Sequence, residues 1–440
     1  MASFLLEPNG IVVGPMDSDY RRLVEINWSK DCWLEPRCII RPTSATQVQI
    51  IMKIINRTSA QFAVRSGGHN PNHGWASIES NGILIDLSLL NQIKVSQDNL
   101  TATTGPGNQW IDVYKRLDGS GRTVLGGRTP DVGVGGLLLG GDISSFSSQF
   151  GFACDYVPDQ ETNEDLWWAL KGGGSNFGIV TEFELETVPI DGIWYESRIY
   201  KPSESRRLLK AVQEYQSAAE SDEKASFAFS LSNNHTIVAF IYSQPAAYPA
   251  VFNMFYHIPF RQHFIKASFG TLYSLAAARD IIAVSTKPDL SLYERSYDKW
   301  LEISEEMLSG FDCMMTFSIQ PVTSSAILMS NARGGNTLNL RPESQQWYTS
   351  VIQWQDDRFD SLAHEAVVRS GDAVREFAHE NGLLLDFEFL NDASWHQTPI
   401  EKYGQANLDR LVDISRRYDP LRGFQRLQGR GFILDVMPEK

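Results

Sequence analysis

VLGGRTPDVGVGGLLLGGD, residues 124–142, carries more glycine than an ordinary helix or strand tolerates. Three further clusters accompany it: VRSGGHN at 64–70, TTGPGNQW at 103–110 and KGGGSNFGIVT at 171–181. Glycine lets main-chain N–H groups converge on an anion with no side chain in the way. None of the four clusters has the strand, fingerprint and helix of a Rossmann unit or a P-loop. Each cluster alone indicates only a turn, so the information lies in their order and spacing.

The segments around these clusters predict an α+β fold. In the first part of the chain, helical patterns such as residues 43–60 alternate with extended runs such as QFAVRS and GILIDLS. From about residue 188, runs with a period of two follow: SFAFSLS, HTIVAFIYS, CMMTFSIQPV, QWYTSVIQW and LLLDFEFLN. A helical stretch at 360–382 lies between the last two. We expect one antiparallel sheet with helices on one face, and a closing helix at 407–420.

The composition is that of a globular protein, and 440 residues are enough for two domains. The formal net charge of −14 argues against nucleic acid or an anionic membrane as a partner. The sequence has no membrane-spanning run and no signal-peptide pattern at its N-terminus, which favours a cytoplasmic location. The four cysteines have no metal-binding spacing, so no metal is expected. Cys32 and Cys38 are expected to be free thiols, with a disulfide as the alternative in an oxidising compartment.

The order of these motifs resembles the FAD domain of vanillyl-alcohol-oxidase-type flavoproteins. The matching line runs from VRSGGHN through GILIDLS, TTGPGNQW, the 124–142 stretch and FGFACDYV to KGGGSNFGIVTEFEL; it resumes in FLNDAS, YGQANLDRL and YDPLRGFQ. Within that group it is most similar to the berberine-bridge-enzyme-like oxidoreductases of fungal secondary metabolism. The resemblance implies a PCMH-type FAD-binding domain at 1–187, completed by 400–440. It also implies a substrate-binding domain at 188–399, with an antiparallel sheet backed by helices.

The same resemblance implies FAD as the cofactor, bonded covalently to His69. Bicovalent relatives hold the flavin a second time through a cysteine, but Thr129 stands at that position, so we expect a single attachment. The other positions implied to hold FAD are loop glycines and their neighbours: Arg65, Ser66, Gly67, Gly68, Asn70, Gly133, Val134, Gly135, Gly136, Gly140, Gly141, Asn176, Gly178, Ile179 and Asn407.

Tyr403 and Asp142 are the candidate catalytic residues. Tyr403 matches a tyrosine that reaches back to the flavin ring in relatives, and it is the first candidate for a base or an orienting hydroxyl. Asp142 stands where relatives usually have glycine or an aromatic residue, and it is either a functional carboxylate or an N-cap.

Three polar residues on expected strands are candidates for binding substrate: Gln320, Glu388 and Asn391. Glu388 is costly to bury unless it is paired or neutral. It therefore lies either on the solvent face or in the site, as a base with a raised pKa.

One departure from the family pattern concerns the connection between CDYV and NEDLWWAL. Relatives carry a β-hairpin there, whereas this chain has only PDQET at 158–162. We expect the short connection to join directly to the helix that begins near Asn163, which leaves the adenine end of the cofactor more exposed.

The implied activity is oxidation of a small natural product. A hydride passes from substrate to flavin, a base takes a proton, and O2 reoxidises the flavin to give H2O2. Oxidative cyclisation of the substrate is a further option. If the loss of the hairpin has removed FAD, the alternative is a cofactor-free cyclase or pericyclase on the same fold. A non-catalytic ligand-binding remnant is the third hypothesis.

Overall fold

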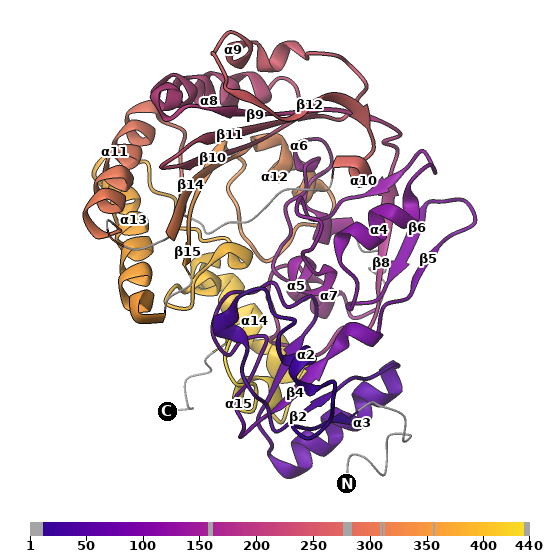
Figure 1. The fold of residues 1–440 in the computed structure, drawn as a ribbon. Coiled ribbons are helices and arrows are strands. Elements are labelled where there is room, and N and C mark those ends of the chain that lie inside the picture. Colours follow the sequence, from indigo (N-terminus) through magenta and orange to yellow (C-terminus); the bar gives the residue numbers. More distant parts are fainter. Residues whose placement is uncertain are drawn as a thin grey trace.

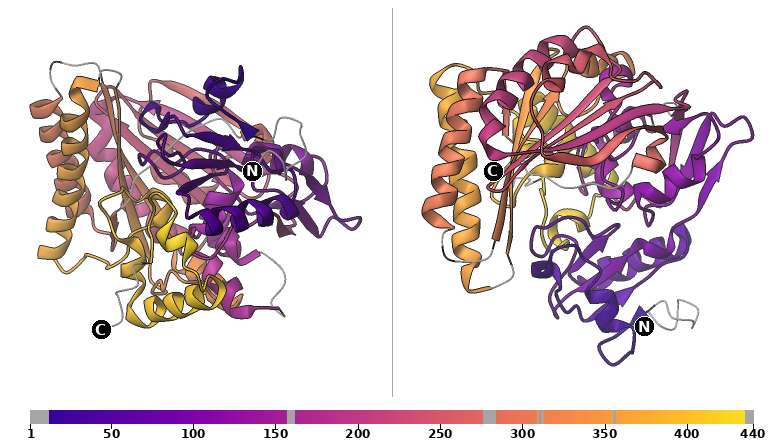
Figure 2. Two further views of the ribbon diagram at one scale, coloured as in Figure 1. Left: turned by 90° about the horizontal axis from the view of Figure 1, so that it is seen from below. Right: turned by 45° about the horizontal axis from the view of Figure 1, so that its top comes forward.

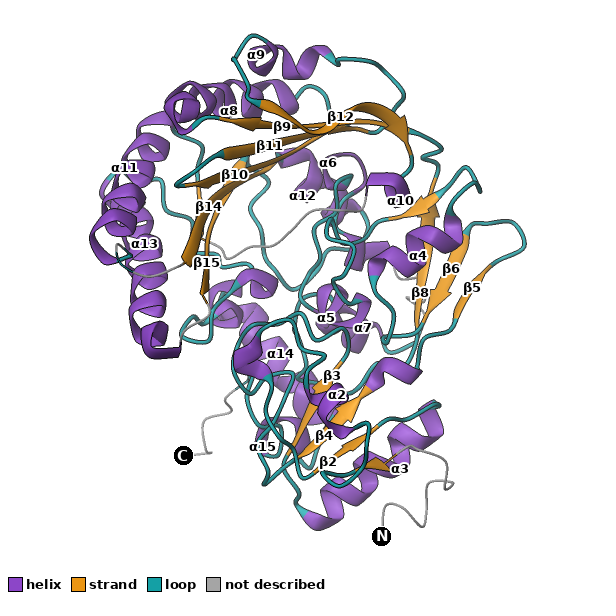
Figure 3. Ribbon diagram, in the orientation of Figure 1, coloured by secondary structure: helices purple, strands orange, loops and turns teal. Residues whose placement is uncertain are grey.

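The computed structural model describes residues 12–156, 162–275, 284–308, 310, 313–354 and 357–434. Their strands form three sheets (Figure 1), with the largest at the top of the view and the two small ones at the right and the bottom. Helices and sheets alternate in layers (Figure 3), and the antiparallel sheets confirm the expected α+β class.

The first small sheet holds the strand that leads into VRSGGHN. Its strands, in spatial order, are β1 (Val12–Val13), β2 (Cys38–Ile40), β4 (Ile83–Asp86) and β3 (Phe62–Arg65). Strands β2, β4 and β3 are parallel, and helix α3 (Ala45–Thr58) is one of the connections between them. The hydroxyl of Ser44 caps that helix by accepting a hydrogen bond from the N–H of Gln47. The apolar face of α3, with Ile51 and Ile55, packs on Phe62 and Ile85.

The second small sheet is antiparallel, and the longest glycine-rich stretch, residues 124–142, packs beside it. Its order is β5 (Ile93–Val95), β6 (Thr101–Thr104), β8 (Phe183–Val188) and β7 (Thr123–Val124). Helix α4 (Trp110–Leu117) and helix α5 (Val134–Leu139) pack against it through Trp110, Val113 and Val134. The chain therefore passes through 124–142 as a loop followed by a short helix.

The large sheet has seven antiparallel strands. In spatial order they are β12 (Gln262–Gly270), β9 (Ile193–Tyr200), β11 (Thr236–Tyr242), β10 (Ala225–Ser232), β14 (Cys313–Val322), β15 (Gln345–Trp354) and β13 (Val284–Thr286). Helices α8 (Ser205–Ala219), α11 (Leu290–Met307) and α13 (Asp360–Glu380) cover one face (Figure 2).

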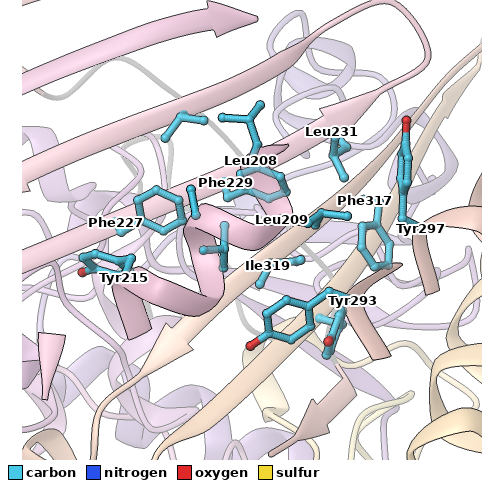
Figure 4. Close-up of a cluster of buried hydrophobic side chains, with 14 of the residues drawn as sticks. Leu208, Leu209, Tyr215, Phe227, Phe229, Leu231, Tyr293, Tyr297, Phe317 and Ile319 are labelled. Carbon is cyan, nitrogen blue, oxygen red and sulfur yellow. The ribbon is translucent and has the colours of Figure 1, made fainter. Parts of the chain in front are cut away.

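Alternation along the central strands explains how one face of this sheet packs on the three long helices. Phe227, Phe229 and Leu231 on β10 and Phe317 and Ile319 on β14 all point into the helix-covered core (Figure 4). Each such side chain contributes roughly 1.5–3 kcal/mol when fully buried. The intervening residues, such as Gln320, belong to the opposite face.

The remaining helices are short connections and the closing segment: α2 (Tyr20–Val24), α6 (Ser147–Phe150), α7 (Glu164–Leu170), α9 (Asn253–Tyr256), α10 (Leu272–Leu275), α12 (Ser324–Ala332), α14 (Gln405–Tyr418) and α15 (Gly423–Arg426). The 3-10 turns are η1 (Lys30–Cys32), η2 (Leu87–Leu89), η3 (Ala153–Tyr156), η4 (Pro202–Glu204), η5 (Ala250–Phe252), η6 (Asp357–Phe359), η7 (Leu390–Asp392) and η8 (Pro399–Tyr403).

The C-terminal segment returns to the first small sheet. The N–H of Phe62 donates to the carbonyl of Leu427, and the N–H of Gly429 donates to the carbonyl of Phe62. Phe424 packs edge-on against the Phe62 ring, with 5.7 Å between ring centroids. The C-terminal segment thus pairs with the edge of β3, the strand that leads into VRSGGHN.

The expectation of a strand over LLLDFEFLN is wrong. A single bridge joins Leu384 to Thr286, after which the chain turns away and reaches η7. The chain bends at Asp386, where the N–H of Phe387 donates to the carbonyl of Leu385 at 2.9 Å, and beyond this bend Phe387 and Phe389 pack on Trp347 in another core. Glu388 and Asn391 therefore lie on a loop and a 3-10 turn, while Gln320 does lie on β14 as expected.

The shortened connection lies mostly outside the described residues, because 157–161 are not among them. The described chain resumes at Thr162, and α7 begins at Glu164 with Asn163 in the N-cap position, as expected. Cys32 and Cys38 are both free thiols. Among the residues that the structure describes, no helix combines the length and the apolarity needed to cross a membrane.

Candidate functional site

A cavity of about 300 Å³ lies where the glycine clusters meet. All four clusters contribute to its wall, together with η7 and the C-terminal segment. Of the residues predicted to bind cofactor or substrate, those that line it are Ser66, Gly67, Gly68, His69, Asn70, Thr129, Gly133, Gly135, Gly136, Gly178, Ile179 and Asn391.

Two of the loops touch backbone to backbone. A Cβ atom on Gly67 would lie 2.5 Å from the Cα of Gly133, and one on Gly133 would lie 2.6 Å from the Cα of Gly67. Neither position accepts a side chain, because both neighbours are main-chain atoms. Gly68 has a φ of +71°, a left-handed conformation that glycine adopts at little cost. The close approach explains why this fold needs glycine in both loops.

Other glycines leave space for a ligand. Gly136 and Gly178 line the cavity, and a Cβ atom on either would meet no protein atom within 4 Å. Because glycine has no side chain, these two positions leave space in the cavity that a larger residue would fill. This cradle of bare backbone fits an elongated, phosphate-bearing group such as FAD.

Arg65 lies behind the loop and not in the cavity wall. It is 1% exposed, and its Nη2 lies 2.5 Å from Oδ2 of Asp86 and donates to the carbonyl of Leu23 at 2.8 Å. Burial alone would raise the pKa of Asp86, but the Arg65 guanidinium and the hydrogen bonds around Ser88 hold that pKa below its usual value. Arg65 thus fixes the end of β3, from which the loop departs.

His69 stands at the cavity wall with two neighbours that sequence reasoning missed. Its ring stacks on Trp28, with centroids 5.5 Å apart and planes inclined by 13°. Its Nε2 lies 3.9 Å from Oδ2 of Asp131. Thr129 lines the same cavity from the loop that carries Asp131. No glycine or motif marks Trp28, so no local signal in the sequence could have drawn attention to it.

His73 takes part in surface ion pairs. Its Nδ1 lies 3.2 Å from Asp31 and its Nε2 lies 3.8 Å from Glu79. Within the described ranges, no group of three or more histidine, cysteine or acidic residues is arranged to hold a metal ion.

A polar cluster sits beside the cavity at the junction with the large sheet. Arg128 lines the cavity, and its Nη2 donates to Oε1 of Gln320 at 2.6 Å. Asp142 is fully buried, and neither of its carboxylate oxygens has a hydrogen-bond partner. Burial raises the pKa of Asp142 to about 8, while the nearby charge of Arg128 opposes the rise. Asp392, on η7, is a further charge beside Arg128 and lines the cavity.

Tyr403 is buried away from the cavity. Its hydroxyl donates to the carbonyl of Gly172 at 3.0 Å, and burial raises its pKa well above the usual value. Asn407 donates to the carbonyl of Thr337 at 3.0 Å. Tyr403 thus holds the approach to α14 against the glycine turn after α7, and Asn407 holds α14 against the loop that follows α12.

Asn176 also acts as an anchor for the chain. Its amide nitrogen donates to the carbonyls of Gly173 and Phe432, both at 2.9 Å, and its oxygen accepts from the N–H of Leu434 at 2.9 Å. The side chain is fully buried. Its hydrogen bonds tie the C-terminal segment to the fourth glycine cluster.

The remaining predicted residues divide between packing and the cavity wall. Val134 is buried in the core of the second sheet. Asn391 lines the cavity, donates to the carbonyl of Leu137 at 2.9 Å, and fills the place that a side chain on Gly140 would need. Gly141 has a φ of +89°, so a side chain there would be strained. Glu388 is buried and lies 3.0 Å from Arg375, outside the cavity lining.

Comparison with known proteins matches residues 36–161 to an FAD binding domain. An FAD-dependent monooxygenase of Arthrobotrys oligospora is 34% identical over 96% of this chain and 86% of its own length. The bifunctional solanapyrone synthase of Alternaria solani is 31% identical over the same shares of the two chains. These matches cover residues on both sides of the cavity.

Solved structures share the fold at low identity. A berberine-bridge-enzyme-like protein of Arabidopsis thaliana has a TM-score of 0.77 and 17% identity, covering 96% of this chain and 98% of its own. The 6-hydroxy-D-nicotine oxidase of Arthrobacter nicotinovorans has a TM-score of 0.75 and 20% identity, covering 97% and 98%. The sequence and structural matches together define an FAD-dependent oxidoreductase. The chain belongs to the family of FAD-dependent oxidoreductases that includes these fungal relatives, and it shares its fold with the berberine-bridge-enzyme-like protein.

The buried carboxyl of Asp142 predicts a pH dependence of stability. The folded protein keeps this proton up to about pH 8, whereas the unfolded chain loses it near pH 4. Between these values the unfolded state binds fewer protons, so stability falls as the pH rises, by at most about 1.4 kcal/mol per pH unit. We expect Asp142→Asn to remove this slope in urea unfolding measured from pH 4 to 8. Asp413→Asn, at an exposed position, is the control. Parallel wild-type and Asp142→Asn curves would contradict the raised pKa.

Proposed function

We propose that this protein is an FAD-linked oxidase that removes a hydride from a C–H bond of a small natural product. The observation that carries the proposal is the position of His69 in the wall of a cavity to which the glycine loops contribute bare backbone. FAD, when bound, supplies the hydride acceptor. The loops around 64–70, 129–136 and 178–179 would hold it, with His69 as the point of covalent attachment.

We assign the two parts of the chain different tasks. Residues 1–187, completed by 400–440, would bind the cofactor, and residues 188–399 would bind the substrate. The contact between Arg128 and Gln320 supports this division, because it joins a glycine-rich loop to the face of the large sheet opposite α8, α11 and α13. Substrate would lie against this face and the cavity, with its reacting carbon within near-attack reach of the flavin.

Asp142 is a better candidate than Tyr403 for accepting a proton. A general base works best when its pKa lies near the working pH, and burial raises the pKa of Asp142 to about 8. Both its oxygens also lack hydrogen-bond partners, whereas the Tyr403 hydroxyl already donates to Gly172. Asp142 directly precedes Ile143, which lines the cavity. It also interacts electrostatically with Arg128, another residue of the cavity wall.

The relatives suggest how the reaction could end. The Arthrobotrys protein is named a monooxygenase, so oxygen could enter the product in place of leaving as peroxide. The Alternaria protein is named a synthase, which supports a bond-forming step such as oxidative cyclisation. We propose O2 as the electron acceptor and H2O2 as its product. A cofactor-free cyclase is the competing hypothesis.

Attachment through His69 predicts that flavin stays with the polypeptide after acid precipitation. His69→Ala should release all of its flavin into the supernatant, because no other nucleophile is expected to replace the imidazole. Peptide mapping of the wild-type protein should find flavin mass on the peptide containing His69 alone, since Thr129 lacks a reactive thiolate. A flavin–cysteine peptide, or complete release of flavin from the wild type, would contradict the single histidine attachment.

The fate of oxygen separates the candidate reactions. For any compound that the enzyme converts, the oxidase predicts H2O2 equimolar with product and no label in the product under 18O2. Label in the product would instead indicate a monooxygenase. Under strict anaerobiosis without another acceptor, the oxidase should stop after a single turnover with bleached flavin. Sustained anaerobic turnover would reject both reactions and favour the cyclase.

A further inference from the structure

The segment Asn27–Trp28 is fastened to the loop that carries His69. The backbone N–H of Trp28 donates to the carbonyl of Gly68 at 3.0 Å. Asn27 is buried, and its amide nitrogen donates to the carbonyls of Cys32 at 2.9 Å and Ala76 at 3.3 Å. Its amide oxygen accepts from Nη1 of Arg65 at 3.3 Å. The backbone of Trp28 is thus held in place by its own hydrogen bond to Gly68 and by the hydrogen bonds of the neighbouring Asn27.

The indole ring of Trp28 covers one face of the His69 imidazole. The two planes are nearly parallel, at 13°, with 5.5 Å between centroids. Trp28 is 37% exposed whereas the His69 side chain is 17% exposed, so the indole lies on the solvent side of the pair. A stacked neighbour of this kind restricts rotation of the imidazole about its χ2 bond.

Asp131 approaches the edge of the same imidazole. Its Oδ2 lies 3.9 Å from Nε2, and it belongs to the loop that also places Thr129 and Gly133 in the cavity wall. A carboxylate beside Nε2 favours the tautomer with the proton on that nitrogen. The lone pair that a new N–C bond requires is then on Nδ1.

We propose that Trp28 and Asp131 are positioning residues for the attachment of flavin to His69. Trp28 fixes the plane of the ring and Asp131 fixes its tautomer. The inference rests on the proposed covalent linkage. Attachment joins an imidazole nitrogen to the C8 methyl carbon of FAD, releases one proton from each partner and leaves two electrons on the isoalloxazine. Dioxygen takes up these electrons with two protons to give H2O2.

The test measures attachment separately from binding. Full-length wild type, Trp28→Ala, Trp28→Phe and Asp131→Asn are purified after expression with riboflavin, and flavin is quantified in the acid pellet and in the supernatant. Attachment is also timed after FAD is added to protein purified from riboflavin-starved cells. Trp395→Ala and Asp413→Asn, both at exposed positions, are the matched controls.

We expect attachment to slow by about 2- to 10-fold in Trp28→Ala, from the loss of an aromatic pair, and by about 2- to 5-fold in Asp131→Asn, from the loss of an exposed carboxylate beside Nε2. Trp28→Phe should recover most of the rate, and total flavin per protein should not change. Unchanged rates in both variants, with covalent flavin in the wild type, would overturn the inference alone. Loss of total flavin with no recovery in Trp28→Phe would show a role in binding or folding, and would also overturn it. Complete release of flavin from the wild type would overturn the linkage and the inference together.

Discussion

The contact between Gly67 and Gly133 is the constraint on which the site depends. Each glycine occupies the space that a Cβ atom on the other would need, so the two loops meet with no side chain between them. This approach brings His69 from one loop and Thr129 from the other into the wall of one cavity. A methyl group at either glycine would force the two loops apart. The buried pair of Arg65 and Asp86 supports the contact from behind.

The cavity is completed by parts of the chain that are distant in sequence. Asn391 reaches from η7 to the carbonyl of Leu137, and Arg128 reaches Gln320 on the large sheet. Asn176 ties the C-terminal segment to the fourth glycine cluster. Because these bonds join the glycine-rich loops to the rest of the fold, a shift of the large sheet can change the geometry of the cavity. The buried Asp142 sits within this junction, where burial lowers the pKa of Arg128 and the charges of Asp392 and Asp142 oppose that effect.

The sequence indicated that the glycine clusters belong together, and the structure brings all four to one cavity. Glycine at 67 and 133 is required by the close approach of the two backbones, and the order of the clusters identified the family. Three features escaped prediction because they depend on tertiary packing. LLLDFEFLN has the alternation of a strand, yet Phe387 and Phe389 both pack on Trp347 and draw it off the sheet. Arg65 and Tyr403 face inward toward partners that no local pattern reveals. Trp28 reaches His69 across 41 positions of sequence, with no motif to mark it.

The central claim is that this chain holds FAD even though its connection after Val157 is shorter than in relatives. The visible absorption spectrum of the purified full-length protein tests it most directly. The account predicts the bands of oxidised flavin at about one flavin per chain, and bleaching of these bands by dithionite. A colourless, folded protein from cells supplied with riboflavin, still colourless after incubation with FAD, would contradict it.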